Sequence, residues 1–217
     1  MKSLLTLTVV VLLGGITGPC ASDDKQGPSF SSASPSPKAL DDQGLPEIPY
    51  DEMLRKVAGL SKQAAIANLK DANLPHGYTE IRIWKGFGLT YPRCFVLSLT
   101  NGNPSASFVA PAVVGNKVVF RNGKPVYANT PLGWPHSGWD DFLDYLKRHG
   151  IGSSINLALD KRYVADPDSE VLVLEMKTGS RYTMAYYNDS TATVDGKKAF
   201  DVCKHIDYAW NFDLGCQ

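Results

Sequence analysis

Residues 170–187 read EVLVLEMKTGSRYTMAYY and hold one alternating pattern longer than any other part of the chain. Successive side chains of a strand point to opposite faces, so the first half presents two sets, Val171, Val173 and Glu175 against Leu172, Leu174 and Met176. A turn follows at Thr178-Gly179-Ser180, and the return segment places on one face Tyr182, Met184 and Tyr186. This pattern predicts a β-hairpin. Because a lone hairpin is marginally stable in water, further strands and a helix must pack on it.

The same alternation, or a short apolar run, predicts further strands at residues 78–87, 93–100, 108–114, 117–121, 124–128 and 154–159. Gly115-Asn116 and Asn122-Gly123 supply tight reversals between three of them, because both residue types tolerate positive φ. Pro125 cannot donate a ladder hydrogen bond, so its strand is expected at an edge.

Three helical regions accompany these strands. The first covers residues 51–69, either as one helix bent at Gly59 or as two short helices, the second of which begins at Ser61. Ser137 and Asp140 form a variant of the capping box before a helix that ends near Gly150. The last helix, residues 197–210, has one apolar stripe, formed by Ala199, Val202, Cys203, Ile206 and Trp210. The sequence therefore predicts a single α+β domain over residues 47–217, with a mostly antiparallel sheet of hairpin-linked strands and helices packed on it.

The composition argues against two classes of partner. The 217 residues contain 22 basic and 22 acidic side chains and no basic run, so nothing favours nucleic acid. The four cysteines and four histidines form no cluster of metal-site spacing. We therefore expect no metal and no cofactor.

The amino terminus has the layout of a secretory signal over residues 1–20. Lys2 precedes an apolar run at residues 4–13, which is too short to remain as a membrane span, and small residues lead to Cys20. This layout resembles the lipobox of bacterial lipoproteins, although Thr17 and Pro19 depart from its pattern. The resemblance implies that Cys20 is acylated and anchors the chain to the membrane of the bacterial envelope. The alternative is a periplasmic or secreted protein without the lipid.

Residues 21–46 are rich in serine, proline, glycine and charged residues. Such a segment buries too little apolar surface to offset the entropy of ordering it, so we expect a disordered linker between the anchor and the domain.

The remaining cysteines allow more than one pairing. Cys203 lies on the last helix and Cys216 just beyond it, so a disulfide between them would fix the carboxy terminus to the helix. Cys94 lies inside an apolar strand, where a free thiol is typical, but pairing of Cys94 with either of the others stays open.

No catalytic constellation is present in the sequence, and we assign no catalytic residue. Asp140, Asp141 and Asp144 precede Lys147 and Arg148 by helical spacings, which indicates a solvated face with ion pairs. For recognition, the segment 134–139 is the best candidate, because Trp134, His136 and Trp139 could offer an aromatic platform to a sugar ring or a protein. The alternative is a purely structural role, in which Trp139 packs under its helix and Trp134 holds the loop.

These observations favour a non-catalytic envelope lipoprotein or secreted module that binds a protein or glycan partner, with an inhibitor or immunity-type protein as one form. Two alternatives stay open. One is a secreted hydrolase whose catalytic groups, such as Cys94 and a distant histidine, meet only in the fold; the other is a structural envelope lipoprotein.

Overall fold

A computed structural model describes residues 49–87, 90–157, 171–188, 193–212 and 214. The expected signal segment, Cys20, the linker and Cys216 lie outside these residues. The statements below concern the described residues.

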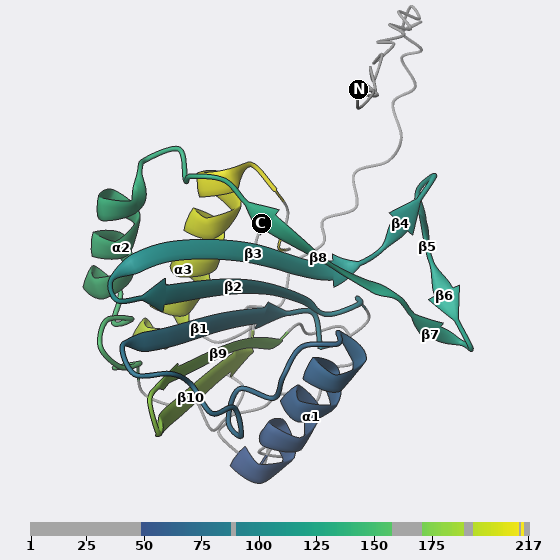
Figure 1. The fold of residues 1–217 in the computed structure, drawn as a ribbon, viewed down its shortest axis with the longest axis horizontal. Coiled ribbons are helices and arrows are strands. Elements are labelled where there is room, and N and C mark those ends of the chain that lie inside the picture. The colour runs from purple at the N-terminus through teal and green to yellow at the C-terminus, as the bar shows by residue number, and fades with distance from the viewer. Residues whose placement is uncertain (1–48, 88–89, 158–170, 189–192, 213, 215–217) are drawn as a thin grey trace, which may run out of the picture. The chain divides into compact units, whose positions relative to one another are not determined.

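An antiparallel sheet of six strands forms the centre of the domain (Figure 1). In spatial order the strands are β10 (Arg181–Asn188), β9 (Val171–Thr178), β1 (Tyr78–Lys85), β2 (Arg93–Thr100), β3 (Asn103–Pro111) and β8 (Tyr127–Leu132). Three helices pack on this sheet, so the predicted α+β class with a mostly antiparallel sheet is confirmed.

The hairpin at residues 171–188 forms as the alternation predicts. Thr178 pairs with Arg181, so Gly179 and Ser180 are the two turn residues. Leu172, Leu174 and Met176 belong to one buried cluster, whereas Val171 and Val173 belong to the cluster on the opposite face. The period of two therefore determined both faces correctly.

The two faces of the sheet are covered by different helices (Figure 1). α2 (Trp139–Arg148) and α3 (Val194–Trp210) pack on the face with Leu172 and Leu174, and the predicted apolar stripe of α3 is buried there. α1 (Tyr50–Gln63) places Met53 and Val57 on the other face.

The face under α1 contains an enclosed polar network. Glu175 on β9 is 0% exposed, and its carboxyl accepts hydrogen bonds from Trp84 Nε1 and Tyr182 Oη, both at 2.7 Å. Burial raises the pKa of Glu175, while the two hydrogen bonds and Arg82 act in the opposite direction. Arg82 is its partner in the β1–β9 register and binds Glu80 Oε1 at 2.7 Å. Burying a polar group costs free energy unless the group has a hydrogen-bond partner. The hydrogen bonds of this network therefore allow Glu175 and Arg82 to be buried in the core.

α1 is a single helix through Gly59, which is one of the two expected alternatives. Three other sequence-based expectations were wrong in detail. Ser61 caps no second helix, and its buried hydroxyl accepts a hydrogen bond from Arg82 Nη1 at 3.4 Å. Ser137 does not cap α2, because Gly138 occupies the cap position with no side-chain cap. Residues 154–157 form no strand, only the single bridge Ile151–Ile155, and residues 158–159 lie outside the described part.

A pair of short hairpins extends from the end of the sheet away from α2 (Figure 1). They consist of β4 (Val113–Val114) with β5 (Lys117–Val118) and β6 (Phe120–Arg121) with β7 (Lys124–Pro125). Both predicted turns are present, at Gly115-Asn116 and at Asn122-Gly123. Residues 112–126 are called the arm below. The predicted strand 117–121 is divided between β5 and β6, and Pro125 lies in a two-stranded ladder.

Candidate functional site

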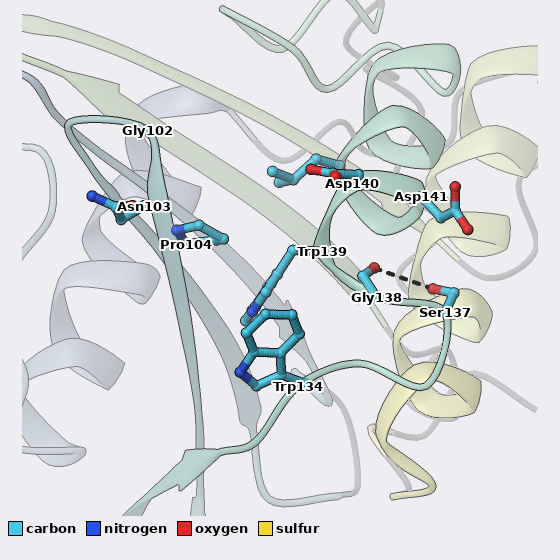
Figure 2. Close-up of a pocket in the computed structure, with 10 residues that line it drawn as sticks. Gly102, Asn103, Pro104, Trp134, Ser137, Gly138, Trp139, Asp140 and Asp141 are labelled. Carbon is cyan, nitrogen blue, oxygen red and sulfur yellow. Dashed lines mark hydrogen bonds between the residues drawn. The ribbon is translucent and has the colours of Figure 1, made fainter.

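A cleft of about 690 Å³ opens between the β2–β3 turn and the start of α2 (Figure 2). One side is formed by Gly102 of the β2–β3 turn and by Asn103 and Pro104 at the start of β3. The other side comes from the loop after β8 and the first turns of α2, which contribute Trp134, Ser137, Gly138, Trp139, Asp140, Asp141 and Leu143.

The pairing of β3 with β8 explains why these distant segments meet. Ala106 pairs with Leu132, so Pro104 and Trp134 each lie two residues beyond the last pair of the ladder. Asn101 and Gly102 both have positive φ, at 50° and 83°, which allows the tight turn that brings β3 back along β2.

Two hydrogen bonds hold the loop with Trp134 on the end of α3. His136 N donates to Ala209 O at 2.9 Å, and Trp210 Nε1 donates to Gly133 O at 2.8 Å. Gly138, with φ at 81°, then directs the chain into α2 and donates to Pro135 O at 2.9 Å. The loop is therefore positioned by hydrogen bonds to its backbone groups before any ligand binds.

The two indoles of the cleft have different environments. Trp139 is half-buried, and its ring packs on Phe142 and Trp210 with centroid separations of 6.2 and 5.7 Å. Trp134 is 77% exposed. Figure 2 shows both indoles directed toward the turn with Asn103 and Pro104. Trp139 is thus fixed by the core, whereas Trp134 offers an open apolar face to a ligand.

Polar groups at the cleft are available for hydrogen bonding. Within the described ranges, the carboxylates of Asp140 and Asp141 contact no hydrogen-bond or ion-pair partner, and both side chains are exposed. Asp144, on the same helix, binds Lys147 Nζ at 3.1 Å and does not line the cleft. The ion-paired face predicted for this helix is therefore present at Asp144, while Asp140 and Asp141 are among the residues that line the cleft.

The structure brings together two of the three residues singled out in the sequence. Trp134 and Trp139 line the cleft, but His136 does not. The His136 side chain is exposed, and this residue helps to hold the loop through its backbone N–H. Asn103 and Pro104 were not anticipated, because only the register of β3 with β8 places that turn opposite Trp134.

The two cysteines within the described residues, Cys94 and Cys203, show no features of a nucleophilic site. Cys94 is a free thiol with no exposed surface, and burial raises its pKa well above the ordinary value, which disfavours the thiolate. Cys203 is buried on α3. Its predicted disulfide with Cys216 stays a prediction, because Cys216 lies outside the described residues.

No cation site emerges from the part of the chain that the structure describes, where no three His, Cys, Asp or Glu side chains gather at ligand distance. In the same residues, no helix is both long and apolar enough to cross a membrane.

A row of stacked rings joins α2 to α3. His205 stacks on Tyr145 with a centroid separation of 3.7 Å, and Tyr145 stacks on His149 at 4.0 Å. Burial lowers the pKa of His205, and the nearby His149 and Arg148 act in the same direction.

The lowered pKa of His205 predicts a pH-dependent stability. Between its folded pKa and the ordinary value of 6.5, the unfolded state binds more protons than the folded state, so stability is complete above 6.5 and is lost as the pH falls below it. A His205→Phe variant keeps the ring stack and lacks the titrating group. Thermal unfolding followed across this pH range should therefore show a smaller decrease for the variant than for the wild type. Parallel curves for the two proteins would contradict the lowered pKa.

Comparison with known protein families, curated proteins and solved structures finds no match for this chain.

Proposed function

We propose that the domain is a non-catalytic module of an exported protein and that it binds an oligosaccharide in the cleft between the β2–β3 turn and α2. The observation that supports this most strongly is the exposed Trp134 indole at the edge of a cleft of about 690 Å³. That volume lies within the range of roughly 300–1,000 Å³ found for small-molecule sites.

The chemistry of the cleft fits a sugar. One face of a pyranose ring is rich in C–H groups and packs on an indole, while its hydroxyls require hydrogen-bond acceptors and donors at the edge. Here Trp134 supplies the apolar face, and Asp140 and Asn103 supply polar groups across the cleft. A loop already held by the Trp210–Gly133 hydrogen bond loses little further entropy on binding.

The charge of the cleft narrows the class of sugar. Asp140 and Asp141 are the charged side chains that line it, and both are acidic. Carboxylated sugars would be repelled, so the ligand class that we propose is a neutral or amino-substituted oligosaccharide.

The cellular location belongs to the same proposal. The amino-terminal signal supports export, and acylation of Cys20 would attach the module to the bacterial envelope, where glycans are present. Measurement of the intact mass of the native protein distinguishes an acylated chain that begins at Cys20 from a soluble secreted one.

The test of this function is an array of immobilised neutral, amino and acidic oligosaccharides, probed with the full chain. We expect binding to members of the first two classes. Asp140→Asn should weaken that binding about tenfold or more, because it removes a charged hydrogen-bond acceptor from the cleft. Asp144→Asn changes the same kind of residue on the same helix outside the cleft and should bind as the wild type does. Equal losses for both variants, or no binding to the array, would contradict the proposal.

A further inference from the structure

The distribution of charge along the chain is strongly uneven. Residues 81–139 contain six lysines and arginines and no aspartate or glutamate. Arg82 and Lys85 are buried in the sheet. Three of the others, Lys117, Arg121 and Lys124, lie exposed on the arm. The arm is therefore a basic surface without a carboxylate of its own, although the whole protein is formally neutral.

The arm also exposes large apolar side chains. Val113 is 59% exposed, Val114 is 72% exposed, and Phe120 is 51% exposed. Phe120 contacts the ring of Tyr91, another exposed residue, in an edge-to-face geometry with centroids 6.0 Å apart. Exposed apolar residues gathered at one projection usually mark an interaction surface.

From these features we infer that the arm binds the surface of an anionic lipid bilayer. Its valines and Phe120 would enter the interface between headgroups and acyl chains, while Lys117, Arg121 and Lys124 would contact the lipid phosphates. This combination of apolar and basic side chains is the one that holds peripheral proteins on anionic membranes.

The geometry of the first hairpin favours a bilayer over an acidic protein. Val113 and Val114 are consecutive residues of β4, so their side chains point to opposite faces of the hairpin, and both are exposed. A protein surface would cover one face and leave the other valine in water. A lipid interface surrounds an inserted hairpin and covers both.

The arm and the cleft lie at opposite ends of the same strands. The β2–β3 turn lines the cleft, whereas the start of β2 and the end of β3 lie at the base of the arm. Eight residues of β2 separate the two by about 25 Å at ~3.3 Å per residue. An arm on the membrane would therefore leave the cleft open on the side away from the bilayer.

The test uses the full chain and two kinds of vesicle, phosphatidylcholine alone and phosphatidylcholine mixed with phosphatidylglycerol. The amino-terminal apolar run contributes equally to all variants, so the measured quantity is the ratio of partition to anionic over neutral vesicles. We expect the triple variant Lys117→Gln, Arg121→Gln, Lys124→Gln to lower this ratio about a hundredfold. The reason is that each basic residue near an anionic surface strengthens binding roughly fivefold, and the three effects multiply. Val113→Ser with Val114→Ser should lower binding to the anionic vesicles about tenfold.

A matched control separates the arm from the overall charge. Arg55→Gln, Lys62→Gln, Lys204→Gln removes three exposed cations elsewhere and should retain most of the wild-type ratio. Equal losses in the two triple variants would overturn the inference. A wild-type ratio near one would also overturn the inference, and it would favour an acidic protein as the partner of the arm.

Discussion

Replacing Glu175 by alanine is expected to lower the free energy of unfolding by about 3–5 kcal/mol. The carboxyl is fully buried and accepts hydrogen bonds from Trp84 Nε1 and Tyr182 Oη. In the alanine variant the buried Trp84 Nε1 and the partly buried Tyr182 Oη lose their acceptor, Arg82 loses its neighbouring carboxyl, and a cavity remains. Urea denaturation followed by circular dichroism measures the loss.

The control for this prediction is Glu52, a carboxylate that is exposed to solvent instead of buried. Glu52 forms an exposed ion pair with Lys56 on α1, and such pairs contribute about 0.3–0.5 kcal/mol. Glu52→Ala should therefore change stability little. If Glu175→Ala were equally mild, the buried network would not be the structural element described above.

Glu175→Gln tests the electrostatic part of the same network. Because burial raises the folded pKa of Glu175 above its ordinary value of 4.5, the folded state holds this proton to a higher pH than the unfolded state does. Its contribution to stability is therefore fully present below pH 4.5 and is lost as the pH rises through the folded pKa. The glutamine side chain does not titrate, so the variant lacks this pH-dependent contribution to stability. Relative to that variant, the wild type should be more stable near pH 4.5 than at neutral pH.

The central part of the fold was predictable because it depends on local periodicity. The alternation of residues 171–187 determined which side chains face α3 and which face α1, and the two turns of the arm followed from Asn and Gly dipeptides. The stripe on α3 was correct for the same reason. The sequence could not show that Gly59 is accommodated within α1, because the helix tolerates a glycine when packing on either side of it stabilises the element.

The site was only half predictable, because it depends on contacts between distant segments. Trp134 and Trp139 could be chosen because they are aromatic residues in or beside a loop. β8, with the sequence YANTPL, has no clear alternation and becomes a strand through its pairing with β3. That pairing is what brings Asn103 and Pro104 to the cleft.

Trp134→Ala is the second variant with a large expected effect. An exposed indole that forms one wall of a binding cleft is the type of residue whose truncation costs 2 kcal/mol or more of binding free energy, which corresponds to about thirtyfold weaker affinity or worse. Stability should change by no more than about 0.5 kcal/mol, because the side chain is 77% exposed in the free protein. Phe120→Ala, an exposed aromatic residue at the far end of the same strands, should leave oligosaccharide binding unchanged.

The most direct measurement is a calorimetric titration of the wild type and Trp134→Ala with the neutral or amino oligosaccharide that gives the strongest array signal. We expect saturable binding by the wild type and at least about thirtyfold weaker binding by the variant, with both proteins equally stable. Retention of wild-type affinity by a folded Trp134→Ala protein would contradict the cleft as the binding site.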